Sequence, residues 1–336
     1  MIKILNSAIA VLMVISSISC RHHITDPPLL VTDAYGVVAP IGSMSTARAA
    51  HTATLLPNGK VLIAGGFANS TYYATAEIYD PDSKTFTPTS TMNATRANHG
   101  ATLLPNGKVF IVGGYSTAGG GDLASAEVYD PATGRFTPTG PMSMAREGGG
   151  AILLKNGKVF VAGGGLAGTP SAELYDPATG SFAPAGSMTT ARTAHTMTML
   201  QDGRILICGG HHGRRSTIVI HASAEIYNPT TDTFTATGDM TTRRHKQDAA
   251  LLPNGQVLIN GGSDERDDQG AYASAEIYNP ATGAFRAIGK MPTIRYKHPG
   301  TSILLPSGKA LLAGGASNAV IYDPVNNTFI AVAGTL

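Results

Sequence analysis

The chain has no tryptophan, only two cysteines among 336 residues, and a charged fraction of 14%. The two cysteines, Cys20 and Cys208, cannot form a disulfide-stapled scaffold, so the fold must rest on strand pairing and packing. The formal net charge of +2 gives no overall attraction for nucleic acid, and we expect no nucleic-acid partner. No Gly-x-Ser-x-Gly motif and no zinc-type Cys/His spacing occurs, so neither a cofactor nor a metal site is expected. In contrast, 40 glycines and 20 prolines among 43% hydrophobic residues indicate many short strands joined by tight turns.

The first twenty residues resemble an export signal and do not belong to the fold. Lys3 gives the positive start, and the mostly apolar run 4–18 is shorter than the roughly 20 residues that a spanning helix needs. The run ends in Ser17-Ile18-Ser19-Cys20, which resembles a bacterial lipobox, although leucine is usual where Ser17 stands. This resemblance implies lipidation of Cys20, with ordinary cleavage nearby as the alternative. We expect an exported lipoprotein of a bacterial envelope, held at the outer membrane only by its lipid, with residues 21–33 as a tether.

Internal repetition decides the fold. The pattern Met-x-x-x-Arg recurs about every 50 residues. Its six copies are Met44/Arg48, Met92/Arg96, Met142/Arg146, Met188/Arg192, Met240/Arg244 and Met291/Arg295.

Each copy continues through four short segments that we expect to be β-strands. In the first copy, segment 61–66 is apolar and ends in paired glycines, typical of a strand covered on both faces. Asn58-Gly59 joins it to segment 51–56 and predicts a hairpin with a type I′ turn. Segment 76–81 leads through a second tight turn into the fourth strand.

One tyrosine and one phenylalanine recur in each copy, which is how the space between adjacent repeats would be filled. They are Tyr79, Tyr129, Tyr175, Tyr227, Tyr278 and Tyr322, and Phe86, Phe136, Phe182, Phe234, Phe285 and Phe329.

The double glycine, the Glu-x-Tyr-Asp-Pro strand, the later aromatic and the opening arginine together resemble Kelch repeats. The resemblance covers residues 34–336 and departs from the family in having phenylalanine where tryptophan is common. It implies an all-β fold, a six-bladed β-propeller of four-stranded blades. Two segments compete for the outer place in the last blade, and we expect 329–334 inside with 38–44 covering it.

Variation between the copies is concentrated in the loops between the second and third segments, whereas the other hairpin turns are uniform. Because these loops would all lie on one face of the propeller, we expect a binding surface there, with drift in unconstrained loops as the alternative. The loops are 67–75, 115–124, 165–170, 211–222, 263–273 and 316–318.

Two repeated positions carry titratable groups. Five copies have a glutamate to match the opening arginine, which indicates structural ion pairs; the sixth has Val320. Histidine follows the arginine by three residues in four copies, at the start of the innermost strand, and this repetition favours a structural role over a metal site at the channel mouth. The glutamates are Glu77, Glu127, Glu173, Glu225 and Glu276, and the histidines are His51, His99, His195 and His298.

One group of basic residues is not repeated and belongs to copies four to six. This basic sector comprises His211, His212, Arg214, Arg215, Arg243, His245, Lys246 and Lys297. Guanidinium groups suit carboxylates, sulfates and phosphates, so the sector predicts an acidic glycan or acidic peptide as ligand. The acidic loop 264–268 offers the alternative of internal charge compensation, and its spacing lacks the EF-hand pattern of a calcium site.

These observations predict a monomeric interaction protein that binds a protein or glycan through the variable face. Kelch-like propellers include galactose oxidase and bacterial sialic acid epimerases, so the alternative is a carbohydrate-acting enzyme, epimerase/mutarotase-like or oxidase-like, at the channel mouth. An oxidase-like copper site needs a tyrosine cross-linked to cysteine, and Cys208 occupies a packed-strand position, so we expect no catalytic residue of that kind. A third possibility is that the propeller is one part of a larger family architecture.

Overall fold

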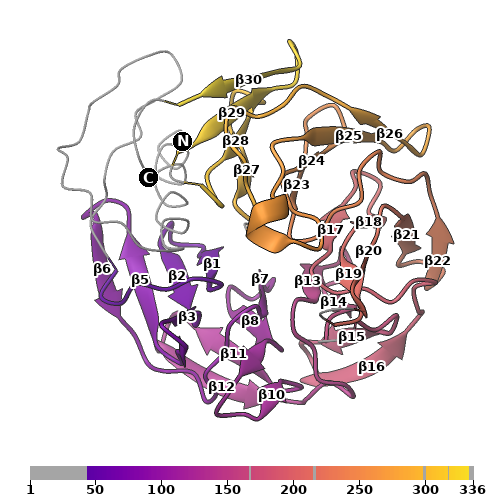
Figure 1. Ribbon diagram of the computed structural model, residues 1–336. Helices are drawn as coiled ribbons and strands as arrows, with labels where there is room; N and C mark the ends of the chain where they lie inside the picture. Colours follow the sequence, from indigo (N-terminus) through magenta and orange to yellow (C-terminus); the bar gives the residue numbers. More distant parts are fainter. Residues whose placement is uncertain (1–43, 166–167, 215–216, 298–299, 317, 333–336) are drawn as a thin grey trace.

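The computed structural model describes residues 44–165, 168–214, 217–297, 300–316 and 318–332. Six four-stranded antiparallel sheets stand as blades around a central axis, so the predicted all-β, six-bladed propeller is confirmed (Figure 1). In each blade the strands follow chain order, with the first strand innermost. The strands are, in blade 1, β1 (Thr52–Leu55), β2 (Val61–Ala64), β5 (Ala76–Asp80) and β6 (Thr85–Pro88); in blade 2, β7 (Gly100–Leu103), β8 (Val109–Val112), β11 (Ala126–Asp130) and β12 (Arg135–Thr139); in blade 3, β13 (Gly150–Leu153), β14 (Val159–Ala162), β15 (Ala172–Asp176) and β16 (Ser181–Ala185); in blade 4, β17 (Thr196–Met199), β18 (Ile205–Cys208), β21 (Ala224–Asn228) and β22 (Thr233–Ala236); in blade 5, β23 (Asp248–Leu251), β24 (Val257–Asn260), β25 (Ala275–Asn279) and β26 (Ala284–Ala287); and in blade 6, β27 (Ser302–Leu304), β28 (Ala310–Leu312), β29 (Val320–Asp323) and β30 (Thr328–Ala331).

The two ends of the chain enter the fold differently. Strand β30 pairs with β29 as the fourth strand of blade 6, which confirms that the C-terminal strand lies inside that blade. The predicted signal, the tether and residues 34–43 lie outside the described residues, and with them most of the expected covering strand. No helix in the described ranges is long and apolar enough to cross a membrane.

The turn between the first two strands of a blade is a hairpin, but the predicted turn type is wrong. In blade 1 the N–H of Gly59 donates to the carbonyl oxygen of Leu56 at 2.9 Å, and only Gly59 has a positive φ, of 81°. Proline at position 57 fixes a negative φ, and Asn58 Oδ1 accepts the N–H of Lys60 at 3.1 Å. The connection is therefore a type I turn followed by a left-handed glycine, the usual three-residue hairpin.

Apolar side chains fill the space between consecutive blades. Five clusters of buried residues join blade 1 to blade 2 and so on round to blade 6. Between blades 2 and 3, Phe110 stacks on Tyr175 with ring centroids 4.0 Å apart. Tyr175 also contacts Phe182, its partner on the neighbouring strand, at 5.1 Å. The repeated tyrosines therefore pack both within and between blades.

The junction between blades 6 and 1 differs from the other five. Among the residues that the structure describes, its apolar side chains form two separate clusters. One lies on blade 1 around Ile63 and Tyr79, and the other lies on blade 6 around Leu311 and Ile321. Among the described strands, blades 6 and 1 therefore share no common apolar cluster at this junction.

A buried arginine stands at the head of every blade. In blade 3, Arg146 Nη2 lies 2.9 Å from Glu173 Oε1, and Nη1 donates to the carbonyl oxygen of Gly163 at 2.8 Å. Glu173 Oε2 accepts the N–H of Ser143 at 2.9 Å, which ties the linker to the third strand. The same arginine–glutamate pair forms in blades 1, 2, 4 and 5 at 2.8–3.0 Å. The predicted structural ion pairs are confirmed, and they lie inside the blades.

Candidate ligand-binding face

A circle of backbone hydrogen bonds surrounds the mouth of the channel, where the chain enters the innermost strands. The second residue after each opening arginine has a left-handed φ between 52° and 65°. From the second copy on, the N–H of this residue donates to the carbonyl oxygen of its counterpart in the preceding blade at 2.9–3.1 Å. Within the described ranges five such bonds form, and none joins the last position to the first. The six positions are Ala50, Asn98, Gly148, Ala194, Lys246 and Lys297.

The non-repeated structure stands on the same side as this circle. Small hairpins rise from blades 1, 2 and 4, and a short 3₁₀-helix rises from blade 5 (Figure 1). Each hairpin begins on a residue that is bridged to the residue after the opening arginine, as Phe67 is to Ala49 and Tyr115 is to Ala97. We call this surface the loop face. Its elements are β3 (Phe67–Ala68), β4 (Thr71–Tyr72), β9 (Tyr115–Ser116), β10 (Gly121–Asp122), β19 (His211–His212), β20 (Val219–Ile220) and η3 (Asp267–Gly270).

The opposite face is built from the uniform hairpin turns. It holds a shallow hollow of about 600 Å³ between the turns of blades 5 and 6, lined by Pro253, Lys309 and Val325 among others. Lys309 and Asp323 pair at 2.9 Å in its wall. None of the predicted site residues lines this hollow.

The two histidines at the centre of the basic sector contribute no positive charge at pH 7. His211 and His245 meet edge to face with ring centroids 4.9 Å apart. Burial, with Lys246 nearby, lowers the pKa of each to about 4. His245 Nε2 lies 3.2 Å from the carbonyl oxygen of Asp264, and it donates if the proton is on that nitrogen. The structure therefore brings these rings together as neutral groups.

The acidic loop pairs with most of the remaining cations of the basic sector. Lys246 Nζ lies 2.5 Å from Asp267 Oδ1, and Lys297 Nζ lies 4.0 Å from Asp267 Oδ2. Arg243 Nη2 lies 3.1 Å from Glu265, in an exposed pair that contributes little to stability. These contacts favour internal charge compensation over an open basic patch.

The last members of the basic sector lie on the hairpin of blade 4. His212 Nδ1 lies 2.9 Å from His221 Nε2, and the two rings stack. Arg214 is exposed, and no carboxylate pairs with it in the described part of the chain. Three predicted residues lie outside the described residues: Cys20, Arg215 and His298.

Two of the repeated histidines lie between blades and not in the open mouth. His99 is 7% exposed, and its Nε2 hydrogen-bonds to Thr52 of the preceding blade at 2.8 Å. The ring fills the space above Gly65, where an added Cβ would come within 2.7 Å of His99 Cε1. His195 lies above Gly163 in the same way, at 2.5 Å. This placement favours the structural role, and at both glycines the carbonyl oxygen of the next opening arginine, within 2.6 Å, also excludes a side chain.

The sequence reasoning missed a different sector of the loop face, on blades 1 to 3. There Phe67, Tyr72 and Tyr115 form a row of partly exposed rings. Beside them Asn98 Nδ2 donates to Glu147 Oε1 at 2.7 Å. The sequence did contain a signal for this sector. Phe67 and Tyr115 follow the paired glycines, and Glu147 follows an opening arginine, where the other copies have different residues.

Comparison with known proteins finds one matching family model and solved structures of similar fold. The model described as the Kelch motif matches residues 48–93, 96–143 and 199–241. No curated protein matches the chain. A fungal alcohol oxidase of the AA5 family, solved in complex with copper, aligns with a TM-score of 0.63 at 20% identity over 79% of this chain and 58% of its own length. YjhT aligns with a TM-score of 0.67 at 13% identity over 86% of this chain and 98% of its own. At these identities the likeness shows the fold alone.

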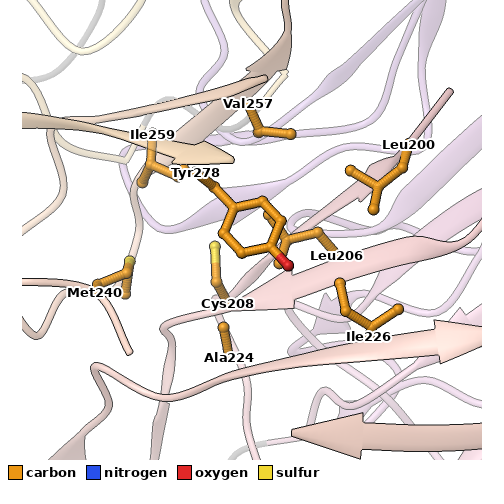
Figure 2. Close-up of a cluster of buried hydrophobic side chains, with 9 residues drawn as sticks. All are labelled: Leu200, Leu206, Cys208, Ala224, Ile226, Met240, Val257, Ile259 and Tyr278. Atoms are coloured by element: carbon orange, nitrogen blue, oxygen red, sulfur yellow. The ribbon is translucent and has the colours of Figure 1, made fainter. Parts of the chain in front are cut away.

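The residues of this chain do not fit the copper site that a galactose-oxidase-like protein would have. Cys208 is 1% exposed and lies in the core between blades 4 and 5, with its sulfur pointing toward the ring of Tyr278 (Figure 2). Burial raises the pKa of its thiol to about 11, and its Sγ contacts Thr196 Oγ1 at 3.2 Å. The hydroxyl of Tyr278 is bound by Thr237 at 2.9 Å, and no histidine belongs to this cluster. In the described ranges no three His, Cys, Asp or Glu side chains form a group that could hold a metal ion.

Proposed function

This chain is a Kelch-repeat β-propeller, and on that premise we propose that it is an exported, lipid-anchored binding protein. It acts as a monomer at the bacterial envelope and holds a protein or glycan ligand on the loop face. One observation carries the proposal: all the hairpins that differ between blades stand on one face, fixed to a rigid circle of backbone, while the other face is uniform. Variable loops on a rigid scaffold are the usual construction of a binding surface.

Among the described cations of the basic sector, Arg214 has no carboxylate partner and could meet an anionic ligand. Arg214 projects from the blade 4 hairpin, whereas Arg243, Lys246 and Lys297 already have carboxylate partners. We expect any acidic glycan or peptide to meet Arg214, with Arg215 beside it in sequence.

A pull-down from envelope extract tests the proposal directly. The full-length chain is compared with a variant carrying Arg214→Ala and Arg215→Ala, and with Arg204→Ala as control. Arg204 is a partly exposed arginine on the opposite face, paired with Asp202 at 2.7 Å. We expect the wild-type chain and the control to capture a partner; loss from the first variant, or weakening by salt, would place an anionic ligand at Arg214. If neither the wild-type chain nor the variants retain any protein or glycan, the binding function is wrong.

The anchor is tested separately. The run 4–18 followed by Cys20 supports lipidation at that cysteine. Cys20→Ser should abolish labelling with a palmitate analogue and release the chain from the membrane fraction. Labelling that persists in Cys20→Ser would disprove the anchor without touching the binding function.

A second candidate, a carbohydrate-acting enzyme, is favoured by one pair of groups at the mouth. Burial raises the pKa of Glu147. Burial also lowers the pKa of Lys246, although the nearby Asp267 carboxylate acts to raise it. Opposed shifts of this kind bring an acid and a base closer in pKa, as proton transfer requires. An enzyme would convert a sugar at catalytic ratios, whereas a binding protein only sequesters it, so proton exchange or ring opening followed by NMR separates the two.

A further inference from the structure

A row of three aromatic rings runs along the loop face from blade 1 to blade 2. Phe67 and Tyr72 stack with centroids 5.5 Å apart and planes at 23°, and Tyr115 follows Tyr72 at 5.4 Å. The rings come from β3, β4 and β9, and none of them belongs to a buried cluster between blades. Side chains that stack outside the core keep part of their faces available to a ligand.

The row is held in place by its backbone. The strands β3 and β4 are joined by Asn69 and Ser70, both left-handed, with φ of 48° and 64°, which is the geometry of a tight hairpin turn. Phe67 and Tyr115 are both bridged to the linker that enters their own blade. The rings therefore stand on fixed main chain, and a ligand would meet them already in position.

A carboxylate and an amide close one end of the row. Asn98 Nδ2 donates to Glu147 Oε1 at 2.7 Å, which leaves Glu147 Oε2 and the amide oxygen of Asn98 as acceptors. Glu147 is near enough to Tyr72 for its charge to raise the pKa of that phenol, after the larger effect of burial. Tyr115 is bridged to Ala97, the neighbour of Asn98, so the amide and the carboxylate bound to it lie beside the rings.

We propose that Tyr72, Tyr115, Asn98 and Glu147 form a subsite for an uncharged saccharide, with Phe67 supporting the rings from behind. A pyranose has an apolar face of C–H groups and a rim of hydroxyls. The ring faces of the two tyrosines suit the C–H face of the sugar, and the oxygen acceptors of Glu147 and Asn98 suit its hydroxyls. The proposal rests on the binding function given above and names the class of its ligand.

The negative charges beside the rings favour an uncharged sugar over an anionic one. Glu147 and Asp122 lie together at this end of the face, and the charge of Asp122 contributes to the raised pKa of Glu147, behind burial and opposed by Asn98 and by Lys246. An anionic sugar would meet the same repulsion. The cations that suit such a ligand lie on blades 5 and 6 and are paired with Asp267.

Glycan-array binding by the detergent-solubilised full-length chain tests the subsite, with the double variant Tyr72→Ala/Tyr115→Ala. The control is Tyr296→Ala, which removes a tyrosine of the loop face in blade 6. A second double variant, Tyr72→Phe/Tyr115→Phe, keeps the ring faces. We expect neutral oligosaccharides to be bound, with affinity lowered about tenfold or more in the alanine variant and nearly retained in the other two. Thermal melting checks that each variant is folded.

A measurement on the wild-type chain guards against a variant that fails to fold. Because the chain has no tryptophan, its intrinsic emission comes from 12 tyrosines, and a sugar stacked on two of them should change it saturably. Neutral glycans that bind equally well to the alanine variant would overturn the subsite and leave the binding function standing. Binding of acidic glycans or peptides alone would overturn it too, and so would a wild-type emission that no neutral sugar changes.

Discussion

Arg295 donates hydrogen bonds to Asn318, to its carbonyl oxygen and, at 3.1 Å, to its side-chain oxygen. In the other five blades the corresponding arginine reaches a glutamate. Val320 takes the glutamate position in blade 6, so among the described residues the fully buried guanidinium there faces only neutral acceptors. Burial without a carboxylate partner lowers the pKa of Arg295 to about 10.

We expect blade 6 to be the least stable blade. Its buried charge lacks compensation, and its apolar face toward blade 1 forms a separate cluster. Native-state hydrogen exchange should therefore show faster exchange for β28 and β29 than for β2 and β5, the corresponding strands of blade 1. Equal protection of the two pairs of strands would contradict this expectation.

Glu173→Ala should destabilise the propeller by about 3–5 kcal/mol, because it leaves the buried Arg146 without its partner. Lys158→Ala in the same blade is the matched control. It breaks the exposed pair with Asp176 at 3.2 Å and should cost about 1 kcal/mol or less. Urea unfolding measures both, and similar midpoints for the two variants would refute the structural role of the buried pair.

Gly163→Ala should be much more damaging than Gly157→Ala in the same blade. Both glycines have a positive φ, of 66° and 82°, which costs an alanine roughly 1–2 kcal/mol. At position 163 the new Cβ would also come 2.5 Å from His195 Cε1 and 2.6 Å from a backbone oxygen, whereas at 157 the nearest atom is 4.0 Å away. Thermal melts of the two variants should therefore differ by several degrees, with Gly163→Ala the lower.

Stability should fall as the pH is lowered below about 6.5, the ordinary pKa of histidine. Burial lowers the pKa of His51 to about 4 and that of His195 to about 3, so the unfolded chain binds protons in a range where the folded chain does not. The loss begins below the unfolded pKa and grows toward the folded values. We expect the Tm to fall by roughly 5 °C or more between pH 7 and pH 4.

A variant identifies the source of this pH dependence. Blade 5 carries Gln247 at the position of His195, so His195→Gln suits the local geometry. It should reduce the slope of Tm against pH. An unchanged slope would assign the acid sensitivity to other groups.

Much of the fold was predictable because the repeats share their physical causes. The paired glycines and the aromatic positions are fixed by packing that recurs in all six blades, and the arginine–glutamate pair recurs in five, so the copies reinforce one interpretation. The turn type was predicted wrongly because Asn-Gly also suits a three-residue loop in which only the glycine is left-handed; the same turn forms at Gly157, where lysine and not proline precedes Asn156.

The site was less predictable, since it depends on contacts between blades. The sequence left open whether the positive charges of Lys246 and Lys297 face a ligand or pair with the acidic loop. Their ion pairs with Asp267 depend on how the loops of different blades are placed, which the sequence does not show. The row of Tyr72 and Tyr115 was missed because the two residues are 43 positions apart (115 minus 72) and lie on different hairpins.

The circle of left-handed residues at the mouth is held by its main chain, whereas any contact with a ligand would be made by its side chains. Its bonds are made by main-chain atoms alone, so changing a side chain there removes none of them, although the left-handed φ disfavours β-branched residues. The side chains at these positions already range from alanine through asparagine to lysine. A diversified library at Ala50, Asn98 and Ala194 should thus sample new recognition properties on an unaltered frame. The same freedom gives evolution a way to change what this propeller recognises without rebuilding it.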